Sequence, residues 1–314
     1  MPPLKTILNP KSYFRFIWKR LQEARLRLQP NLRGTVRYPP GHYYSPLLDI
    51  QSLGPNDSNL PFDGVELWEH VNLRQGEQRA YYEDLLDRFP LLPFPCQKTD
   101  SYRYFKENDW FPLSDAFTLS GIIRKEKPCR IVEVGSGFSS AVMLDTLGQT
   151  RASAALTFIE PNPDRLYSLL SPDDRSIPTV LVQRVQEVPL SVFDQLEAHD
   201  LVFIDSSHVA KIGSDVSYIL LRILPRLKPG VIVHFHDVFY PFSYPAAWIR
   251  GGLAWNESLF LRAFLVGNPQ FQLVAFNAYA GYSFPEVFRD RLPAFLNNTG
   301  GSMWIQKLGE EGRA

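Results

Sequence analysis

The chain has 314 residues, and its 33 basic and 33 acidic side chains give a formal net charge of zero. A hydrophobic content of 45% and a charged content of 21% are those of an ordinary soluble globular protein. The sequence contains no run of about 18–20 consecutive apolar residues, which excludes an integral membrane protein. The two cysteines, Cys96 and Cys129, have no metal-finger spacing, which excludes a disulfide scaffold and a zinc module.

The charge is distributed unevenly along the chain. Residues 1–40 hold nine basic side chains and one acidic side chain, so this arm carries +8. The remaining residues hold 24 basic and 32 acidic side chains and carry −8. A division of this size suggests that the two parts have different tasks.

Within the basic arm, the apolar residues of the segment 13–28 recur at helical spacing. Three interpretations stand: a helix packed on the protein's own core, an interfacial helix on anionic lipid with Trp18 at headgroup depth, or a segment that contacts nucleic acid. The N-terminus lacks the apolar core of a secretory signal, so we expect a cytoplasmic protein whose membrane contact, if any, is peripheral and made by this segment. Residues 41–110 follow as an N-terminal extension with one helix near Leu67–Arg88, which packs on the larger domain or caps a substrate pocket.

From residue 111 onward, β-branched stretches alternate with helical stretches, which is typical of βαβ units. The expected helices are Asp115–Lys125, Ser139–Leu147, Pro163–Leu170, Leu190–Ala198, Gly213–Leu227 and Glu257–Phe264. The expected strands are Arg130–Val134, Leu156–Glu160, Thr179–Arg184, Leu201–Asp205, Val231–His236, Phe271–Phe276 and Ser302–Leu308. No long helix separates the last two strands, so we expect them to pair antiparallel. The prediction for 111–314 is an α/β fold with a Rossmann-like, doubly wound, mostly parallel seven-stranded sheet and an antiparallel last strand.

Ligands of doubly wound sheets bind beyond the carboxyl ends of the strands, so the residues after each strand are the site candidates. The first strand supplies five of them: Glu133, Gly135, Ser136, Gly137 and Ser139. The two glycines allow close backbone approach, and the following helix offers its N-terminal amides. Glu160 ends the second strand, where it can accept hydrogen bonds from ribose hydroxyls. Together these residues indicate a nucleoside-containing cofactor; the alternative is a tight glycine turn beside a surface glutamate.

Glu133 would repel the pyrophosphate of a dinucleotide, whereas a carboxylate suits a cofactor with an ammonium group and a sulfonium charge. The segment Glu133–Ser139 resembles the first motif of class I S-adenosylmethionine-dependent methyltransferases. Glu160 matches the ribose-binding acid of that family, and Leu227–Gly230 (LKPG) matches the turn before its fifth strand. The resemblance covers about 111–308 and implies S-adenosyl-L-methionine as the cofactor, with Gln186 at the adenine. Two departures are that Ser139 replaces the third glycine and that the interval from Glu133 to Glu160 is longer than usual.

Two further strand ends carry acidic and histidine side chains. Asp205 and His208 follow the fourth strand, and His236 and Asp237 end the fifth. This pattern is similar to that of metal-dependent small-molecule O-methyltransferases, including those that act on macrolide sugars. The resemblance implies that Asp205 and Asp237 bind Mg²⁺ and that His208 is the general base. The alternatives are that Asp205 binds the methionine end of the cofactor or caps a helix, and that His236 only orients Asp237.

The loop Phe239–Ala254 is long and aromatic, as a lid or substrate wall would be. We expect Tyr240 and Trp248 to contact the substrate or, equally, to pack on the N-terminal region. Asn256 and Glu257 open the next helix; both are candidates for completing the metal site, and Asn256 also for contacting the substrate.

The predicted function is therefore S-adenosylmethionine-dependent methylation of a small-molecule or glycoside hydroxyl. One alternative is a non-catalytic, methyltransferase-like binding or membrane-peripheral protein. Another is an iron-dependent hydroxylase that uses the same cluster of histidines and carboxylates. A nucleic-acid substrate is not expected, because the predicted catalytic region is net acidic and would repel phosphates.

Overall fold

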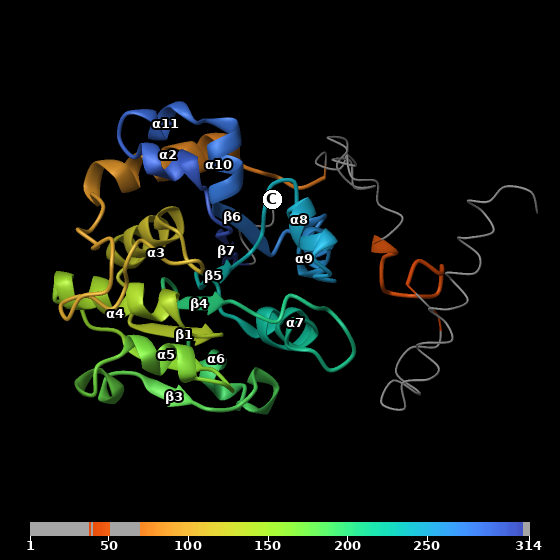
Figure 1. Ribbon diagram of the computed structural model, residues 1–314, viewed down its shortest axis with the longest axis horizontal. Coiled ribbons are helices and arrows are strands. Elements are labelled where there is room, and N and C mark those ends of the chain that lie inside the picture. The colour runs from red at the N-terminus through yellow and green to blue at the C-terminus, as the bar shows by residue number, and fades with distance from the viewer. Residues whose placement is uncertain (1–37, 39, 51–69, 310–314) are drawn as a thin grey trace, which may run out of the picture. The chain divides into compact units, whose positions relative to one another are not determined.

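The computed structural model describes residues 38, 40–50 and 70–309 (Figure 1). Contacts divide the described residues into two compact units. The smaller unit contains residues 38, 40–50 and 246–254, and the larger unit contains residues 70–245 and 255–309. The predicted helix at 13–28 lies outside the described residues. Within those residues, no helix combines the length and the apolar character needed to cross a membrane.

The larger unit is built on a seven-stranded sheet with the order β3-β2-β1-β4-β5-β7-β6 (Figure 1). The strands are β1 (Arg130–Val134), β2 (Ala155–Ile159), β3 (Thr179–Leu181), β4 (Leu201–Ile204), β5 (Ile232–Phe235), β6 (Phe271–Phe276) and β7 (Met303–Lys307). Strands β1 to β5 run parallel to their neighbours, and β7 pairs antiparallel with both β5 and β6. The predicted Rossmann-like sheet with an antiparallel last strand is confirmed.

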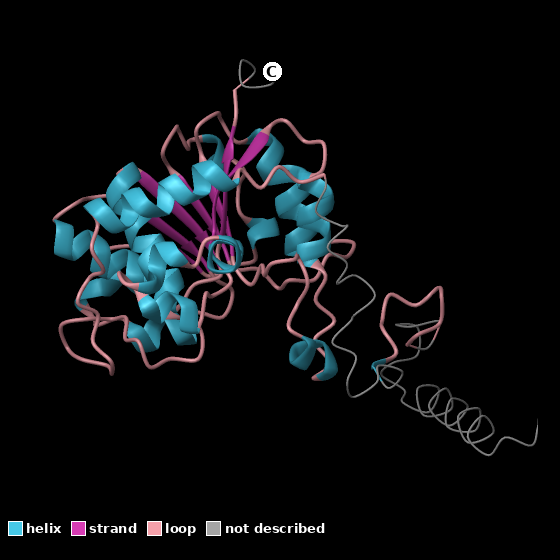
Figure 2. Cartoon of the chain, turned by 90° about the horizontal axis from the view of Figure 1, so that it is seen from above, coloured by secondary structure: helices cyan, strands magenta, loops and turns pink. Residues whose placement is uncertain are grey.

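Helices lie on both sides of these strands (Figure 2). They are α2 (Gln75–Arg88), α3 (Leu113–Glu126), α4 (Phe138–Thr150), α5 (Asp164–Leu169), α6 (Ser191–Asp194), α7 (Asp215–Tyr218), α9 (Glu257–Leu265), α10 (Asn277–Ser283), α11 (Glu286–Arg289) and α12 (Pro293–Asn297), with α8 (Ala246–Arg250) in the smaller unit. Strands β4 and β5 are buried along their whole length. Near-continuous burial of this kind follows when helices cover both faces of a parallel sheet.

The helical segment expected at Gly213–Leu227 changes its geometry along its length. It begins after Ser214, whose side chain accepts a hydrogen bond from a backbone N–H of the first turn. Helix α7 then passes into a π-helical turn at Ile219–Ile223 and a 3-10 turn at Leu224–Arg226. Pro225 has no N–H to donate, so a regular α-helix cannot continue through it.

Residues 70–111 pack on the core of the larger unit. The side chain of Tyr82 in α2 is fully buried, and its hydroxyl donates to Oδ1 of Asn277 at 2.6 Å. Further along, Arg103 pairs with Asp145 of α4 at 2.8 Å. These contacts anchor the segment that leads into α3 and bring Trp110 to the carboxyl ends of the strands.

Candidate functional site

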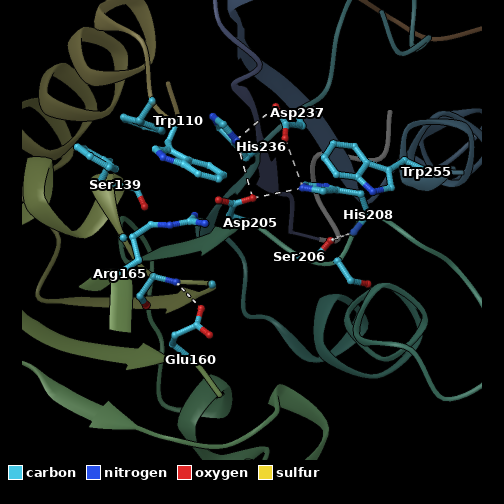
Figure 3. A pocket seen from close by; sticks show the side chains of 16 residues that line it. Trp110, Ser139, Glu160, Arg165, Asp205, Ser206, His208, His236, Asp237 and Trp255 are labelled. Atoms are coloured by element: carbon cyan, nitrogen blue, oxygen red, sulfur yellow. Dashed lines mark hydrogen bonds and ion pairs between the residues drawn. The ribbon is translucent and has the colours of Figure 1, made fainter. Parts of the chain in front are cut away.

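A cavity of about 280 Å³ opens at the carboxyl ends of the parallel strands (Figure 3). Its lining combines residues that follow β1, β2, β4 and β5 with residues from the segment before α3. Nine of the sequence-predicted site residues line this cavity: Gly135, Ser136, Gly137, Ser139, Glu160, Asp205, His208, His236 and Asp237. The remaining six, Glu133, Gln186, Tyr240, Trp248, Asn256 and Glu257, are not part of the lining.

The turn after β1 requires glycine at its first position. Gly135 has a φ of +81°, and a Cβ atom there would overlap the carbonyl oxygen of Asp205. Its N–H donates to the carbonyl of Ile159 at 3.0 Å, which ties the turn to the end of β2. The close approach of the two strand ends leaves the N-terminus of α4 open to the cavity.

Glu160 reaches the cavity from the end of β2. Its carboxylate accepts hydrogen bonds from the backbone N–H of Ser136 at 3.1 Å and of Asn162 at 2.7 Å. Each of its oxygens can accept a further bond, so the carboxylate can also receive hydroxyl donors from a ligand. Gln186, by contrast, donates through Nε2 to the carbonyl of Gly213 at 3.0 Å, outside the cavity lining.

Glu133 points into the core rather than into the cavity. It is fully buried, and its carboxyl group accepts hydrogen bonds from the hydroxyls of Ser139, at 2.6 Å, and Ser140 in the first turn of α4. Burial raises the pKa of Glu133 to about 8, against the lowering effect of these hydrogen bonds. The residue therefore fixes the start of α4 against β1, so the predicted contact with the cofactor's ammonium group is not what its position favours.

Replacing Glu133 with glutamine should make the free energy of unfolding less dependent on pH. Between the ordinary pKa of a glutamate and about 8, folded Glu133 keeps a proton that the unfolded chain has lost. The free energy of unfolding of the wild type therefore falls as pH rises through this window, by up to about 1.4 kcal/mol per pH unit. Urea unfolding at pH 5 and pH 8 should show a smaller decrease in Glu133→Gln than in the wild type. Glu107→Gln, at an exposed position, is the control; a wild-type profile as flat as that of Glu133→Gln would contradict the prediction.

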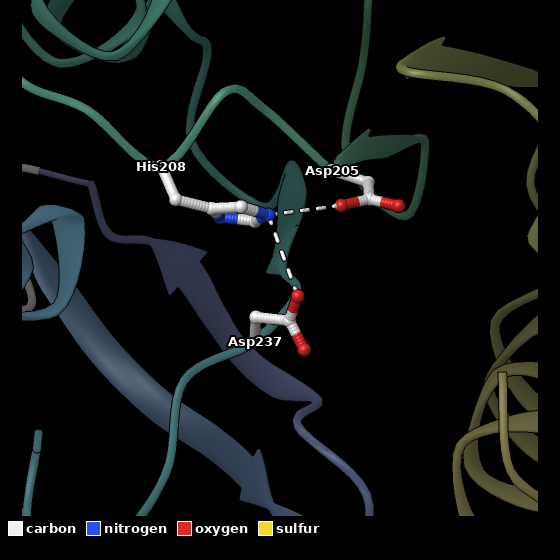
Figure 4. Close-up of side chains that lie close together, drawn as sticks. All are labelled: Asp205, His208 and Asp237. Atoms are coloured by element: carbon white, nitrogen blue, oxygen red, sulfur yellow. Dashed lines mark ion pairs between the residues drawn. The ribbon is translucent and has the colours of Figure 1, made fainter. Parts of the chain in front are cut away.

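Asp205, His208 and Asp237 meet at the ends of β4 and β5 (Figure 4). Nε2 of His208 lies 3.3 Å from Oδ1 of Asp205 and 3.4 Å from Oδ2 of Asp237. The three candidate ligand atoms all lie within 4.8 Å of one another. His208 and Asp237 both have left-handed backbone conformations, with φ of +58° and +54°. Such conformations cluster at functional sites, where the surrounding structure holds them in place.

Glu257 holds the other nitrogen of His208. Its carboxylate is buried, lies 2.8 Å from Nδ1 of His208, and accepts a hydrogen bond from the Ser206 hydroxyl at 3.0 Å. Burial alone would lower the pKa of His208, but its hydrogen bonds to Asp205 and Glu257 raise it to about 10. Glu257, which the sequence marks as a metal-site candidate, instead orients the imidazole so that Nε2 faces the cavity.

A second histidine, His236, and a further carboxylate, that of Asp115, lie next to the cluster of Asp205, His208 and Asp237. Nε2 of His236 lies 3.3 Å from Oδ2 of Asp115, and its Nδ1 lies 3.6 Å from Oδ1 of Asp237. Burial lowers the pKa of His236, while the charges of Asp237 and Asp115 raise it to about 9. Asp115 comes from the first turn of α3, and no sequence pattern predicted this role. The three residues whose ligand atoms lie within 4.8 Å of one another are one histidine and two carboxylates, whereas the iron triad of the hydroxylase hypothesis has two histidines and one carboxylate.

The three residues expected to contact the substrate do not line the cavity. Tyr240 packs against the rings of Tyr279 and Tyr282, and Asn256 bonds through its side chain to both backbone groups of Ala210. Trp248 belongs to α8 of the smaller unit.

The aromatic residues that do line the cavity are Trp110, Phe111, Phe138 and Trp255. None of them appears among the sequence-predicted site residues. The ring of Trp255 lies 4.3 Å from that of His208, centre to centre.

Comparison with known proteins supports the predicted family. A family described as "Methyltransferase domain" matches residues 132–238. An uncharacterized protein of Archaeoglobus fulgidus is 31% identical over 168 residues, which cover 51% of this chain and 74% of the relative.

Two solved structures are similar at low identity. The S-adenosylhomocysteine-bound methyltransferase PaMTH1 of Podospora anserina has 16% identity and a TM-score of 0.41, over 74% of this chain and 88% of that chain. The O-methyltransferase TomG of Streptomyces achromogenes, bound to S-adenosylmethionine, has 16% identity and a TM-score of 0.41, over 74% and 90%. The matched domain and the sheet lead to one conclusion: residues 132–238 form a methyltransferase domain, and the predicted membership of the class I S-adenosylmethionine-dependent methyltransferase family is confirmed.

Proposed function

We propose that this protein transfers a methyl group from S-adenosylmethionine to a hydroxyl of a small molecule or a glycoside. The observation that carries this proposal is that one cavity joins two groups of residues. The turn at Gly135–Gly137 and Glu160 suit a nucleoside, and His208 with Asp205 and Asp237 suits an oxygen nucleophile. A hydroxyl placed at Nε2 of His208 would lie in the same cavity as the cofactor, and such positioning can contribute about 7–11 kcal/mol at best.

When bound, the cofactor supplies an electrophilic methyl group on a positively charged sulfur. His208 takes the hydroxyl proton at Nε2, while its Nδ1–H donates to Glu257. The oxygen would keep the electron pair of the broken O–H bond and use it to form the new O–C bond, while the bond between sulfur and the methyl carbon would break, its electron pair would stay on sulfur, and S-adenosylhomocysteine would leave. Against the lowering effect of burial, however, the hydrogen bonds of His208 to Asp205 and Glu257 raise its pKa to about 10 and leave it protonated at neutral pH.

The donor set of the cluster fits a divalent cation. Carboxylate oxygens suit Mg²⁺ and Mn²⁺, and an imidazole nitrogen is accepted by Mn²⁺. Asp205 and Asp237 would hold such an ion, with His208 within reach as a third ligand or as the base. Its positive charge would offset the two carboxylates and lower the pKa of His208, so that the imidazole can act as a base at neutral pH.

Calorimetry with S-adenosylhomocysteine tests the proposed cofactor. The wild type should bind it, and Gly135→Arg should lose binding because no side chain fits beside the carbonyl of Asp205. Glu160→Gln keeps the fold and should weaken binding about tenfold, as expected for the loss of a hydrogen bond to a charged group. Gly76→Ala, where a Cβ meets no atom within 4 Å, is the matched glycine control. No binding by the wild type, or binding that neither Gly135→Arg nor Glu160→Gln changes, would refute the proposal.

Mn²⁺ binding tests the metal site. Titration followed by electron paramagnetic resonance should show one bound Mn²⁺ in the wild type and at least tenfold weaker binding in Asp237→Asn, because a ligand loses its charge. Asp194→Asn removes an exposed carboxylate that pairs with Arg226 and should leave Mn²⁺ binding unchanged. Equal affinities in Asp237→Asn and Asp194→Asn would mean that the cluster holds no metal, leaving a metal-free reaction.

The acceptor itself can be sought by transfer of a labelled methyl group from S-adenosylmethionine to a panel of hydroxylated small molecules and glycosides.

A further inference from the structure

Arg165 has no role so far in the proposed methyl transfer or in the proposed metal site. It is the single arginine or lysine among the residues that line the cavity, and it is exposed in the first turn of α5. Among the described residues it forms no ion pair. Its guanidinium instead lies over the ring of Trp110, with Cζ 3.6 Å from the ring centre. A cation in this position has its charge available to a ligand.

Hydrogen bonds of the Asn108 side chain fix the turn that carries Trp110, and with it the indole ring of the stack. Oδ1 of Asn108 accepts hydrogen bonds from the backbone N–H groups of Trp110, at 3.0 Å, and Phe111, at 2.7 Å. Nδ2 of Asn108 donates to the carbonyls of Phe105 and Phe111. This turn fixes an indole ring that is 55% exposed at the cavity. Stacking occupies the face of the guanidinium, so the N–H donors at its edge remain directed into the cavity.

The position of Arg165 lies between the two halves of the proposed active site. Its side chain runs between Trp110 and Glu160, toward Asp205 (Figure 3). A Cβ on Gly137 would lie 3.1 Å from Cδ of Arg165, so the side chain passes directly over the glycine turn. A ligand whose adenosine half binds Glu160 and whose reactive end faces His208 must therefore pass close to this guanidinium.

We propose that Arg165, positioned by Trp110, binds the carboxylate of the amino-acid end of S-adenosylmethionine. This inference rests on the proposed function. The amino-acid end carries an ammonium group and a carboxylate, and the cavity already offers the carboxylates of Glu160, Asp205 and Asp237 to a positive group. A ligand carboxylate in the same cavity needs a cation that is not already paired. His208 and His236 are both engaged with protein carboxylates. Arg165 forms no ion pair among the described residues and acts on Asp205 only through its charge, so its guanidinium edge can form a two-point contact with a ligand carboxylate.

Three ligands separate the contribution of the carboxylate from that of the rest of the cofactor. They are S-adenosylhomocysteine, its analogue without the carboxylate, and 5′-methylthioadenosine, which lacks the whole amino-acid end. Calorimetry should show that Arg165→Gln binds S-adenosylhomocysteine about 10–100-fold more weakly than the wild type, the range for a lost charge-assisted hydrogen-bonded pair. The same variant should bind the other two ligands within about twofold of the wild type. Trp110→Ala should show a smaller loss that is likewise confined to the ligand with the carboxylate.

Arg222→Gln, at an exposed arginine outside the cavity lining, is the matched control and should bind all three ligands as the wild type does. If Arg165→Gln binds S-adenosylhomocysteine as tightly as the wild type, the assignment is wrong and the proposed function still stands. Equal losses for the ligands with and without the carboxylate would show that Arg165 acts only through the shape of the site, which also overturns the assignment. A wild type that binds none of the three ligands overturns the proposed function together with this inference.

Discussion

Replacing His208 with glutamine should lower kcat for methylation of the acceptor about 10²–10⁴-fold, the usual contribution of a general base. The expectation rests on the position of Nε2, which faces the cavity while Nδ1 is held by Glu257 at 2.8 Å. Glutamine can keep a hydrogen bond to a carboxylate but cannot take a proton. Affinity for S-adenosylhomocysteine should stay within about twofold of the wild type, since a residue that acts only on the proton affects the reaction and not ligand binding.

Two further variants test whether the loss of kcat is specific to His208 and depends on its protonation. His199→Gln alters an exposed histidine that pairs with Glu126 and should leave kcat unchanged. Glu257→Gln removes one of the two partners that raise the pKa of His208. Activity that needs neutral His208 rises with pH as the imidazole loses its proton, so the rising limb of the pH profile should shift to lower pH in Glu257→Gln. A His208→Gln variant that retains kcat within a few-fold would mean that the acceptor loses its proton to another group or to solvent.

The parallel half of the fold could be predicted from the sequence because its central strands β1, β4 and β5 are buried along nearly their whole length. Arg130–Val134, for example, has the bounds expected from its β-branched run. The three short helices between β6 and β7 were not predicted. Their aromatic residues pack on Tyr82 of α2, with ring centres of Phe288 and Phe295 5.3 and 5.9 Å away. A pattern that depends on a partner more than 200 residues earlier leaves no local periodicity in the sequence.

The site likewise combines residues that their position after a strand predicts with residues that only tertiary packing brings together. Asp205, His208 and Asp237 could be expected to meet because they follow neighbouring parallel strands. Trp110 and Asp115 could not, because they reach the site from the segment before β1 through tertiary packing. Glu133 shows a third case, in which the residue type fits a ligand but the strand directs its side chain toward α4. There, alternation of side chains along β1 decides the outcome, and the motif alone does not.

Replacing Asp115 with alanine should lower the free energy of unfolding by about 3–5 kcal/mol, as for the loss of one partner of a buried charged network. Asp115 is fully buried and accepts hydrogen bonds from Nδ2 of Asn277 at 2.8 Å and from the N–H groups of Gly301 and Ser302, both at 3.1 Å. Each donor left without an acceptor costs about 1–3 kcal/mol. Gly300 is part of the same arrangement, because its φ of +72° brings the backbone against the carboxylate so closely that a Cβ would overlap it. Urea unfolding measures the loss.

Asp164→Asn, at an exposed acid that also lies in the first turn of a helix, should change stability by less than about 0.5 kcal/mol. The pKa of His236 separates the structural effect from an effect on the site. Asp115 is one of the groups that raise this pKa to about 9, so NMR titration of Asp115→Asn should show it lowered. A loss of stability below about 1 kcal/mol together with an unchanged pKa would mean that water replaces the carboxylate. A large loss of stability together with a lowered pKa of His236 would instead mean that a single residue of α3 both fixes the segment just before β7 and helps to set the protonation of the histidine beside Asp237.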